Sequence, residues 1–123
     1  MRIYRGPRNK RELEKIMQFS TAGGVAPNAK PVAPTDEELA NYEDTTKLTA
    51  GECMRPKPKQ DIVTDFTEYT TDENVAKGFG RRCDYYVCAE VEDDLVKIFP
   101  NDCLEKGVLV RSDTPIKCTK IRV

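Results

Sequence analysis

Short segments of alternating or helically spaced apolar residues run along the chain, separated by glycine and proline. Residues 2–6 predict a short strand that ends at the Gly-Pro step, because proline has no N–H for a strand ladder. Leu13, Ile16 and Met17 then recur at the spacing of one helix face, and Asn9 is a suitable N-cap. We expect this helix to end near Ser20, ahead of a Gly-Gly pair.

Residues 22–60 carry little periodic signal and are interrupted by several prolines. A long irregular stretch within a compact domain is usually functional or disordered. Thr35 followed three residues later by Glu38 fits a capping box, which predicts one short helix here with Leu39 and Tyr42 on its apolar face. This Pro-rich segment is therefore expected to be a loop with a single helix in it.

The second half of the chain is dominated by strand patterns. A strand is predicted at 62–66, followed by a short helix at 72–79 that Thr71 or Asp72 would cap. Val75, Ala76 and Phe79 would face inward on this helix. Strands are predicted at 84–91 and 95–99, and a hairpin at 107–123 around residues 112–115. Residues 1–123 thus predict one α+β domain, with a helical first half and a β-rich second half.

Composition excludes several classes of function. The 123 residues carry a net charge of −1, so the basic surplus typical of nucleic-acid binding is missing. The chain has no histidine, which excludes Ser-His-Asp triads, Cys-His proteases and His-containing zinc sites. No apolar run approaches the roughly 20 residues of a membrane span, and the first residues lack the apolar core of a secretory signal.

The cysteines favour reduced thiols. There are five, an odd number with no Cys-x-x-Cys pair, whereas a secreted disulfide framework would more often be even. They are Cys53, Cys83, Cys88, Cys103 and Cys118. We expect them to serve mostly as small core residues in a cytosol-like compartment. The acidic stretch at 90–94 lacks the spacing of a calcium loop, so no metal site is expected.

Four features could carry chemistry, and one of them is the Gly23-Gly24 pair in a loop that could close over a small ligand. Arg5 beside Gly6 ends the first strand, where a guanidinium can clamp a phosphate or carboxylate. Thr70 and Thr71 lie where a strand meets a helix, and their hydroxyls can bond a ligand. Glu105 precedes the strand at 107–111, where a carboxylate can bond a sugar hydroxyl or stabilise an oxocarbenium-like centre. Taken singly, these features are better explained as a surface arginine, a helix cap, a turn glutamate and a helix stop. Arg81 and Arg82 could also meet a phosphate, but the exposed end of the preceding helix is the better explanation.

The order of these features resembles the Arg–Ser–Glu class of the mono-ADP-ribosyltransferase superfamily, and most of all its small bacterial toxin and effector domains. The resemblance rests on three motifs that span residues 4–121. They are Tyr4-Arg5-Gly6, Tyr69-Thr70-Thr71-Asp72 with Val75-Ala76-Lys77-Gly78-Phe79, and Glu105-Lys106-Gly107-Val108-Leu109-Val110 with Thr114-Pro115. The absence of histidine agrees, because the other major class needs one to contact the ribose.

The resemblance implies a split β-sandwich, with two small mixed sheets facing each other across a cleft that takes NAD as substrate. It implies that Arg5 and Gly6 contact the phosphates or ribose, and that Tyr69, Thr70, Thr71 and Phe79 shape the nicotinamide pocket. Glu105 would be the catalytic carboxylate. The implied activity is transfer of ADP-ribose from NAD to a side chain of an unidentified protein target. An immunity or host partner, and a cytoplasmic or effector-delivered location, go with it.

One position departs from the family pattern. The catalytic carboxylate is usually the second glutamate of Glu-x-Glu, and Gly107 stands at that position here. Glu105 could enter the site through a shifted loop, or Glu68 could substitute for the missing carboxylate. A third alternative is a catalytically degenerate domain that binds a nucleotide or partner without chemistry, and a fourth is an accidental likeness of short motifs.

Overall fold

The computed structural model describes residues 1–39, 49–51 and 65–123, and these form an α+β fold, as predicted. Its helices and strands follow one another in this order: β1 (Arg2–Arg5), α1 (Lys10–Phe19), β2 (Phe66–Thr70), α3 (Glu73–Gly80), β3 (Tyr85–Glu90), the 3-10 turn η2 (Asp93–Leu95), β4 (Val96–Ile98), β5 (Gly107–Arg111) and β6 (Lys117–Arg122). The strands make one sheet in the order β4-β5-β2-β1-β3-β6. Every pairing between neighbouring strands is antiparallel.

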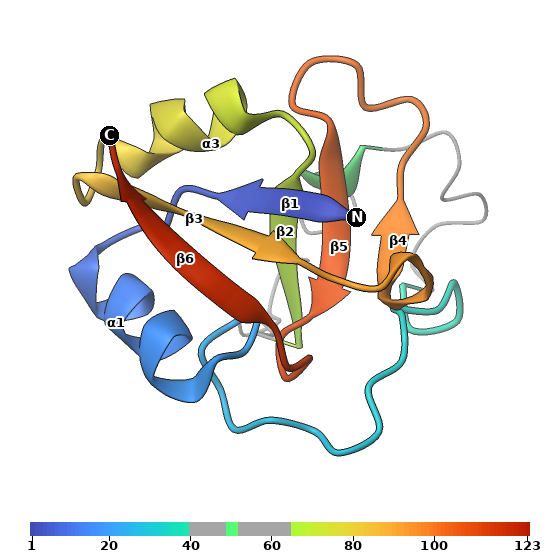
Figure 1. The fold of residues 1–123 in the computed structure, drawn as a ribbon. Coiled ribbons are helices and arrows are strands. Elements are labelled where there is room, and N and C mark those ends of the chain that lie inside the picture. The colour runs from blue at the N-terminus through green and yellow to red at the C-terminus, as the bar shows by residue number, and fades with distance from the viewer. Residues whose placement is uncertain (40–48, 52–64) are drawn as a thin grey trace, which may run out of the picture.

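The sheet is bent where its two halves meet. β4, β5 and β2 form one half, β1, β3 and β6 form the other, and the two run at a steep angle to each other (Figure 1). The link between the halves is the pairing of β1 with β2, whose register is the single pair Tyr4↔Thr70. The expectation of two separate mixed sheets is therefore wrong for the described residues. The Tyr4↔Thr70 pair joins the two three-stranded halves, so that they form one antiparallel sheet instead of two.

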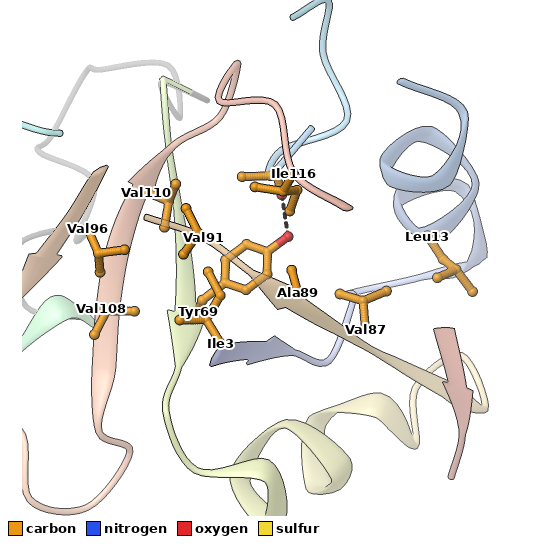
Figure 2. Close-up of a cluster of buried hydrophobic side chains, with 11 residues drawn as sticks. Ile3, Leu13, Tyr69, Val87, Ala89, Val91, Val96, Val108, Val110 and Ile116 are labelled. Carbon is orange, nitrogen blue, oxygen red and sulfur yellow. Dashed lines mark hydrogen bonds between the residues drawn. The ribbon is translucent and has the colours of Figure 1, made fainter. Parts of the chain in front are cut away.

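The main core fills the inside of the bend. Tyr69 lies at its centre, between the valines of β4 and β5 on one side and Ile3, Val87 and Ala89 on the other (Figure 2). The Tyr69 side chain is 1% exposed, and its hydroxyl donates a 2.8 Å hydrogen bond to the carbonyl oxygen of Ala22. This bond satisfies the one polar atom of a large buried ring.

Helix α1 begins and ends through local side-chain and backbone geometry. The Asn9 side chain accepts the N–H of Glu12 at 2.9 Å, which confirms the predicted N-cap. The helix ends at Ser20, which adopts a left-handed conformation with φ of 53° while its N–H bonds the Ile16 carbonyl. The predicted end is confirmed, and Ser20 itself makes the C-cap.

Helix α3 is capped by Asp72, whose side chain accepts the N–H of Asn74 at 3.0 Å. Ala76 is fully buried against the sheet, as predicted. Phe79 differs from the prediction, because its side chain is 43% exposed. The inner face of this short helix is filled instead by the close approach of Gly6, where an added Cβ would lie 2.4 Å from the backbone nitrogen of Gly80.

The predicted hairpin of β5 with β6 is wrong. β5 pairs with β2 and β4, and β6 pairs with β3 at the far edge of the sheet. The segment between them crosses from one half of the sheet to the other and bonds the loop after α1. Ser112 and Thr114 accept backbone hydrogen bonds from Gly23 and Ala22 at 2.8 and 3.0 Å. These long-range backbone bonds, rather than the residues of the turn, determine that β5 pairs with β2 and β4 while β6 pairs with β3.

The predicted capping box is confirmed at its start. The Glu38 N–H donates to Thr35 Oγ1, and the Thr35 N–H donates to Glu38 Oε1, both at 3.2 Å. Arg111 of β5 also donates to both carboxylate oxygens of Glu38, which ties this turn to the sheet. Residues 22–39 otherwise form turns and irregular structure. Tyr42, Cys53 and the predicted strand residues 62–64 lie outside the described residues.

Candidate functional site

A pocket of about 220 Å³ opens between β1, β2 and the inner side of α3. Its lining brings together residues that are far apart in the sequence: Tyr4, Arg5, Gly6, Arg8, Glu68, Tyr69, Thr70, Val75, Ala76, Phe79 and Arg82. Pockets that enclose a whole drug-sized ligand measure roughly 300–1,000 Å³. This pocket can therefore enclose only part of a dinucleotide.

Arg5 is held at the base of the pocket by two elements. Its Nε donates to Glu12 Oε1 at 2.8 Å, and its Nη1 donates to the carbonyl oxygen of Glu68 at 2.8 Å. The Arg5 and Glu12 side chains are 16% and 14% exposed, so this ion pair is largely shielded from water. Arg5 thus links α1 to β2 across the end of β1 and fixes the backbone at Glu68.

The loop between β4 and β5 is fastened to the end of β2. The Thr70 hydroxyl donates to the carbonyl oxygen of Glu105 at 2.6 Å, and the Thr71 N–H donates to the Lys106 carbonyl at 3.2 Å. The buried Asp102 also holds this loop, because its carboxylate accepts hydrogen bonds from the N–H groups of Glu105 and Gly107 at 3.1 and 3.0 Å. The two predicted motifs at Thr70 and Glu105 therefore lie in direct contact.

Glu68 is the most perturbed carboxyl of this region. Burial, followed by the charges of Glu105 and Asp102, raises the pKa of Glu68 to about 7, while Arg5 opposes the change. A carboxyl that titrates near neutral pH, beside a second carboxyl in a pocket, is a typical acid–base arrangement.

The predicted site residues fall into two groups. Arg5, Gly6, Thr70 and Phe79 line the pocket, and Glu105 adjoins it through Thr70. Thr71 is exposed and contributes its backbone to the loop contact. Tyr69 also borders the pocket, but its ring points into the core and its hydroxyl is bonded to Ala22. Their ligand contacts stay predictions.

Sequence reasoning missed Glu12, Asp102 and Arg8, and it favoured an exposed helix end over a phosphate contact for Arg82. Glu12 carried a recognisable signal, because it is the third residue after the N-cap Asn9 and a glutamate there often bonds back to the preceding backbone. Its Oε2 does accept the N–H of Arg8 at 2.6 Å. Asp102 and Arg8 gave no local signal, because only the folded chain brings Arg8 to the pocket and Asp102 to the backbone of the Glu105 loop.

Comparison with known proteins gives no match: no protein-family model matches the sequence, and no curated protein matches it. Among the described residues, no helix is long and apolar enough to cross a bilayer. Cys83, Cys88, Cys103 and Cys118 are free thiols. Cys83 is buried, Cys88 and Cys118 are half-buried and Cys103 is exposed, so the expectation that the cysteines are mostly core residues is wrong for the described part of the chain. Function is argued below from the geometry of the pocket.

The raised pKa of Glu68 predicts a pH-dependent effect on stability. The folded protein binds the Glu68 proton more tightly than the unfolded chain, so stability is lost as pH rises from about 4.5 to about 7. Glu68→Gln removes this loss. Between pH 4.5 and 8, the free energy of unfolding of Glu68→Gln, measured with urea, should rise relative to that of wild type by about 1–2 kcal/mol, after allowance for solvent screening. Glu37→Gln, at an exposed position, is the control. A pH-independent difference for Glu68→Gln would contradict the prediction.

Proposed function

We propose that this protein is an NAD-dependent mono-ADP-ribosyltransferase that transfers ADP-ribose to a protein side chain. The observation that carries the proposal is that the Arg5 and Thr70 motifs line one pocket and that the loop of Glu105 adjoins it through Thr70. Arg5, Thr70 and the loop of Glu105 come from different parts of the chain and meet at the junction of the two sheet halves. The fold, a single antiparallel sheet bent between two three-stranded halves, is compatible with this proposal but is not specific to it.

The chemistry needs few groups. The bond between C1′ of the ribose and the nicotinamide nitrogen breaks, nicotinamide leaves with the electron pair, and the ribose carbon takes on oxocarbenium character. A carboxylate such as Glu105 stabilises this positive charge and accepts a hydrogen bond from the ribose hydroxyl. A nucleophile on the target then forms the new bond to C1′ and loses a proton.

Glu68 is suited to receive that proton. A group with a pKa of about 7 exchanges protons readily at neutral pH, and Glu68 lies beside Glu105. Arg5, fixed by Glu12, would hold the ribose end of the substrate against these carboxylates. In this arrangement the chain contributes mainly positioning and electrostatics, which suits a protein without histidine.

A binding module without chemistry is the second candidate, and Gly107 is the observation that favours it. A side chain at this position would meet Asp102 Oδ2 at 2.8 Å and Glu68 Oε1 at 3.2 Å. The place of the usual catalytic glutamate is thus occupied by other carboxylates. In that case the pocket would bind a nucleotide and leave it uncleaved.

Release of nicotinamide from NAD by the purified protein tests the proposal. Wild type should release nicotinamide, Glu105→Gln should lower the rate by about 100-fold, the typical loss for an electrostatic stabiliser, and Arg5→Ala should weaken NAD binding. Glu92→Gln, exposed next to η2 and outside the pocket lining, should leave the rate unchanged.

The outcomes separate the candidates. Full activity in Glu105→Gln would remove that residue from the mechanism. Wild type that binds NAD without releasing nicotinamide would favour the binding module. Wild type that neither binds nor cleaves NAD would overturn the proposal.

A further inference from the structure

Two arginines on the rim of the pocket are not explained by the predicted motifs. Arg8 follows β1, and its side chain is 57% exposed. Arg82 follows α3 and is also exposed. Residues 8 and 82 are 74 positions apart (82 − 8), yet both line the same 220 Å³ pocket. Their common position at the mouth of one pocket suggests a shared ligand.

Arg82 is held in place by uncharged groups, so the partners that hold it do not neutralise its positive charge. Its Nε donates to the Phe79 carbonyl at 3.1 Å and its Nη2 donates to the Gly6 carbonyl at 2.9 Å. The guanidinium carbon also lies 5.2 Å from the centre of the Phe79 ring. All of these partners are neutral, and no carboxylate of the described residues forms an ion pair with Arg82. A fixed but uncompensated guanidinium is well prepared to bind an anion.

Arg8 is only partly compensated. Its Nε lies 3.5 Å from Glu12 Oε2, but the other oxygen of the same carboxylate is already bonded to Arg5. One carboxylate therefore serves two arginines. Glu68 is the acidic residue in the pocket lining, and with its pKa raised to about 7 it is only partly ionised at neutral pH. Three guanidinium groups thus face less than two negative charges.

The three arginines lie at different depths in the pocket, and this difference indicates different roles in binding a ligand. Arg5 is 16% exposed and bonded to Glu12 and to the Glu68 backbone, so it lies beside the carboxylates at the base of the pocket. Arg8 and Arg82 lie at its mouth. Since guanidinium groups bind phosphate oxygens in a bidentate way, a ligand with its sugar at the base would present its phosphates to the rim.

We propose that Arg8 and Arg82 form an anion-binding rim that holds the pyrophosphate of the substrate, while Arg5 positions the ribose end and Glu68. The inference rests on the proposed function for the identity of the substrate. The anion site itself does not, because it depends only on the charge and geometry of the rim. Inorganic pyrophosphate can therefore be used as a separate probe.

Calorimetric titration of the purified protein with inorganic pyrophosphate and with NAD tests the rim at low ionic strength. Arg8→Ala should weaken the binding of both ligands about tenfold, and Arg82→Lys should weaken it by a similar factor, because lysine lacks the planar fork. Arg11→Ala is the matched control, since Arg11 is exposed on α1 and outside the pocket lining. Arg8 is exposed, so its variant is expected to fold.

The two ligands separate the two proposals. Binding of both ligands with unchanged affinity in Arg8→Ala and Arg82→Lys would overturn the rim and leave the proposed function standing. Arginine-dependent binding of pyrophosphate together with failure to bind NAD would support the rim and overturn the proposed function. A wild type that binds neither ligand would overturn both.

Discussion

Gly6→Ala should destabilise the protein by about 3 kcal/mol, at the upper end of the cost of overpacking. The added Cβ would lie 2.4 Å from the Gly80 nitrogen, 2.5 Å from the Ala76 oxygen and 2.6 Å from the Phe79 carbonyl carbon. All three are backbone atoms of α3 or its last turn, so no side chain can rotate away. Ordinary contact begins near 3.4 Å, and α3 would have to withdraw by about 1 Å (3.4 − 2.4).

The expected loss corresponds to a fall in Tm of roughly 10 °C for a domain of this size. Because α3 forms one wall of the pocket, ligand binding should weaken even where the variant remains folded. Gly78→Ala is the matched control, because nothing lies within 4 Å of its added Cβ. Alanine at this helical position should stabilise by about 0.5–1 kcal/mol. Equal thermal melts for Gly6→Ala and wild type would show that α3 does not pack on Gly6 in this way.

The cost at Gly6 also bears on its place in the Tyr-Arg-Gly motif. The sequence alone suggested a ligand contact for this glycine. In the structure its lack of a side chain permits the close approach of α3, and its carbonyl oxygen accepts a bond from Arg82. Gly6 thus shapes the pocket indirectly, by letting the helix reach the strand.

Local features of the fold were predictable because they depend on neighbours in the sequence. The Asn9 cap, the reciprocal bonds of Thr35 with Glu38 and the Asp72 cap each involve residues two or three positions apart. The pairing of β5 and β6 was not predictable in this way. Ser112 looks like part of a tight turn, but its carbonyl is bonded by Gly23, 89 positions earlier (112 − 23). Such contacts are decided by the packing of the whole sheet.

The same distinction applies to the pocket. Arg5, Thr70 and Glu105 were found because a familiar order of motifs draws attention to them. For Arg82 the sequence favoured an ordinary helix end over a phosphate contact, because its bond to the Gly6 carbonyl, 76 positions away, leaves no trace in the local sequence. Tyr69 shows the opposite error, since it lies within a motif and borders the pocket, yet its hydroxyl bonds the Ala22 carbonyl and its ring is part of the core.

Gly107→Glu restores the glutamate of the family pattern, yet it should destabilise this protein by about 3 kcal/mol without increasing nicotinamide release. The new Cβ would lie 2.8 Å from Asp102 Oδ2 and 2.9 Å from the Ala50 Cβ. Asp102 cannot move freely, because its two oxygens hold the N–H groups of Glu105 and Gly107. The added carboxylate would also face Asp102 and Glu68, and like charges so close repel one another.

Gly107→Gln separates the two causes, because it has nearly the same shape without the charge. Overpacking should cost both variants about 2 kcal/mol, and repulsion should cost Gly107→Glu about 1 kcal/mol more at pH 8. The difference between them should become smaller as the pH falls below 7, because Glu68, whose pKa is raised to about 7, then binds a proton and loses its charge. Urea unfolding at pH 8 and at about pH 5 measures it. A Gly107→Glu protein that is as stable as wild type and releases nicotinamide faster would show that the site accepts a carboxylate at position 107. The residue at position 107, and not Glu105 or Glu68, would then be the carboxylate that acts.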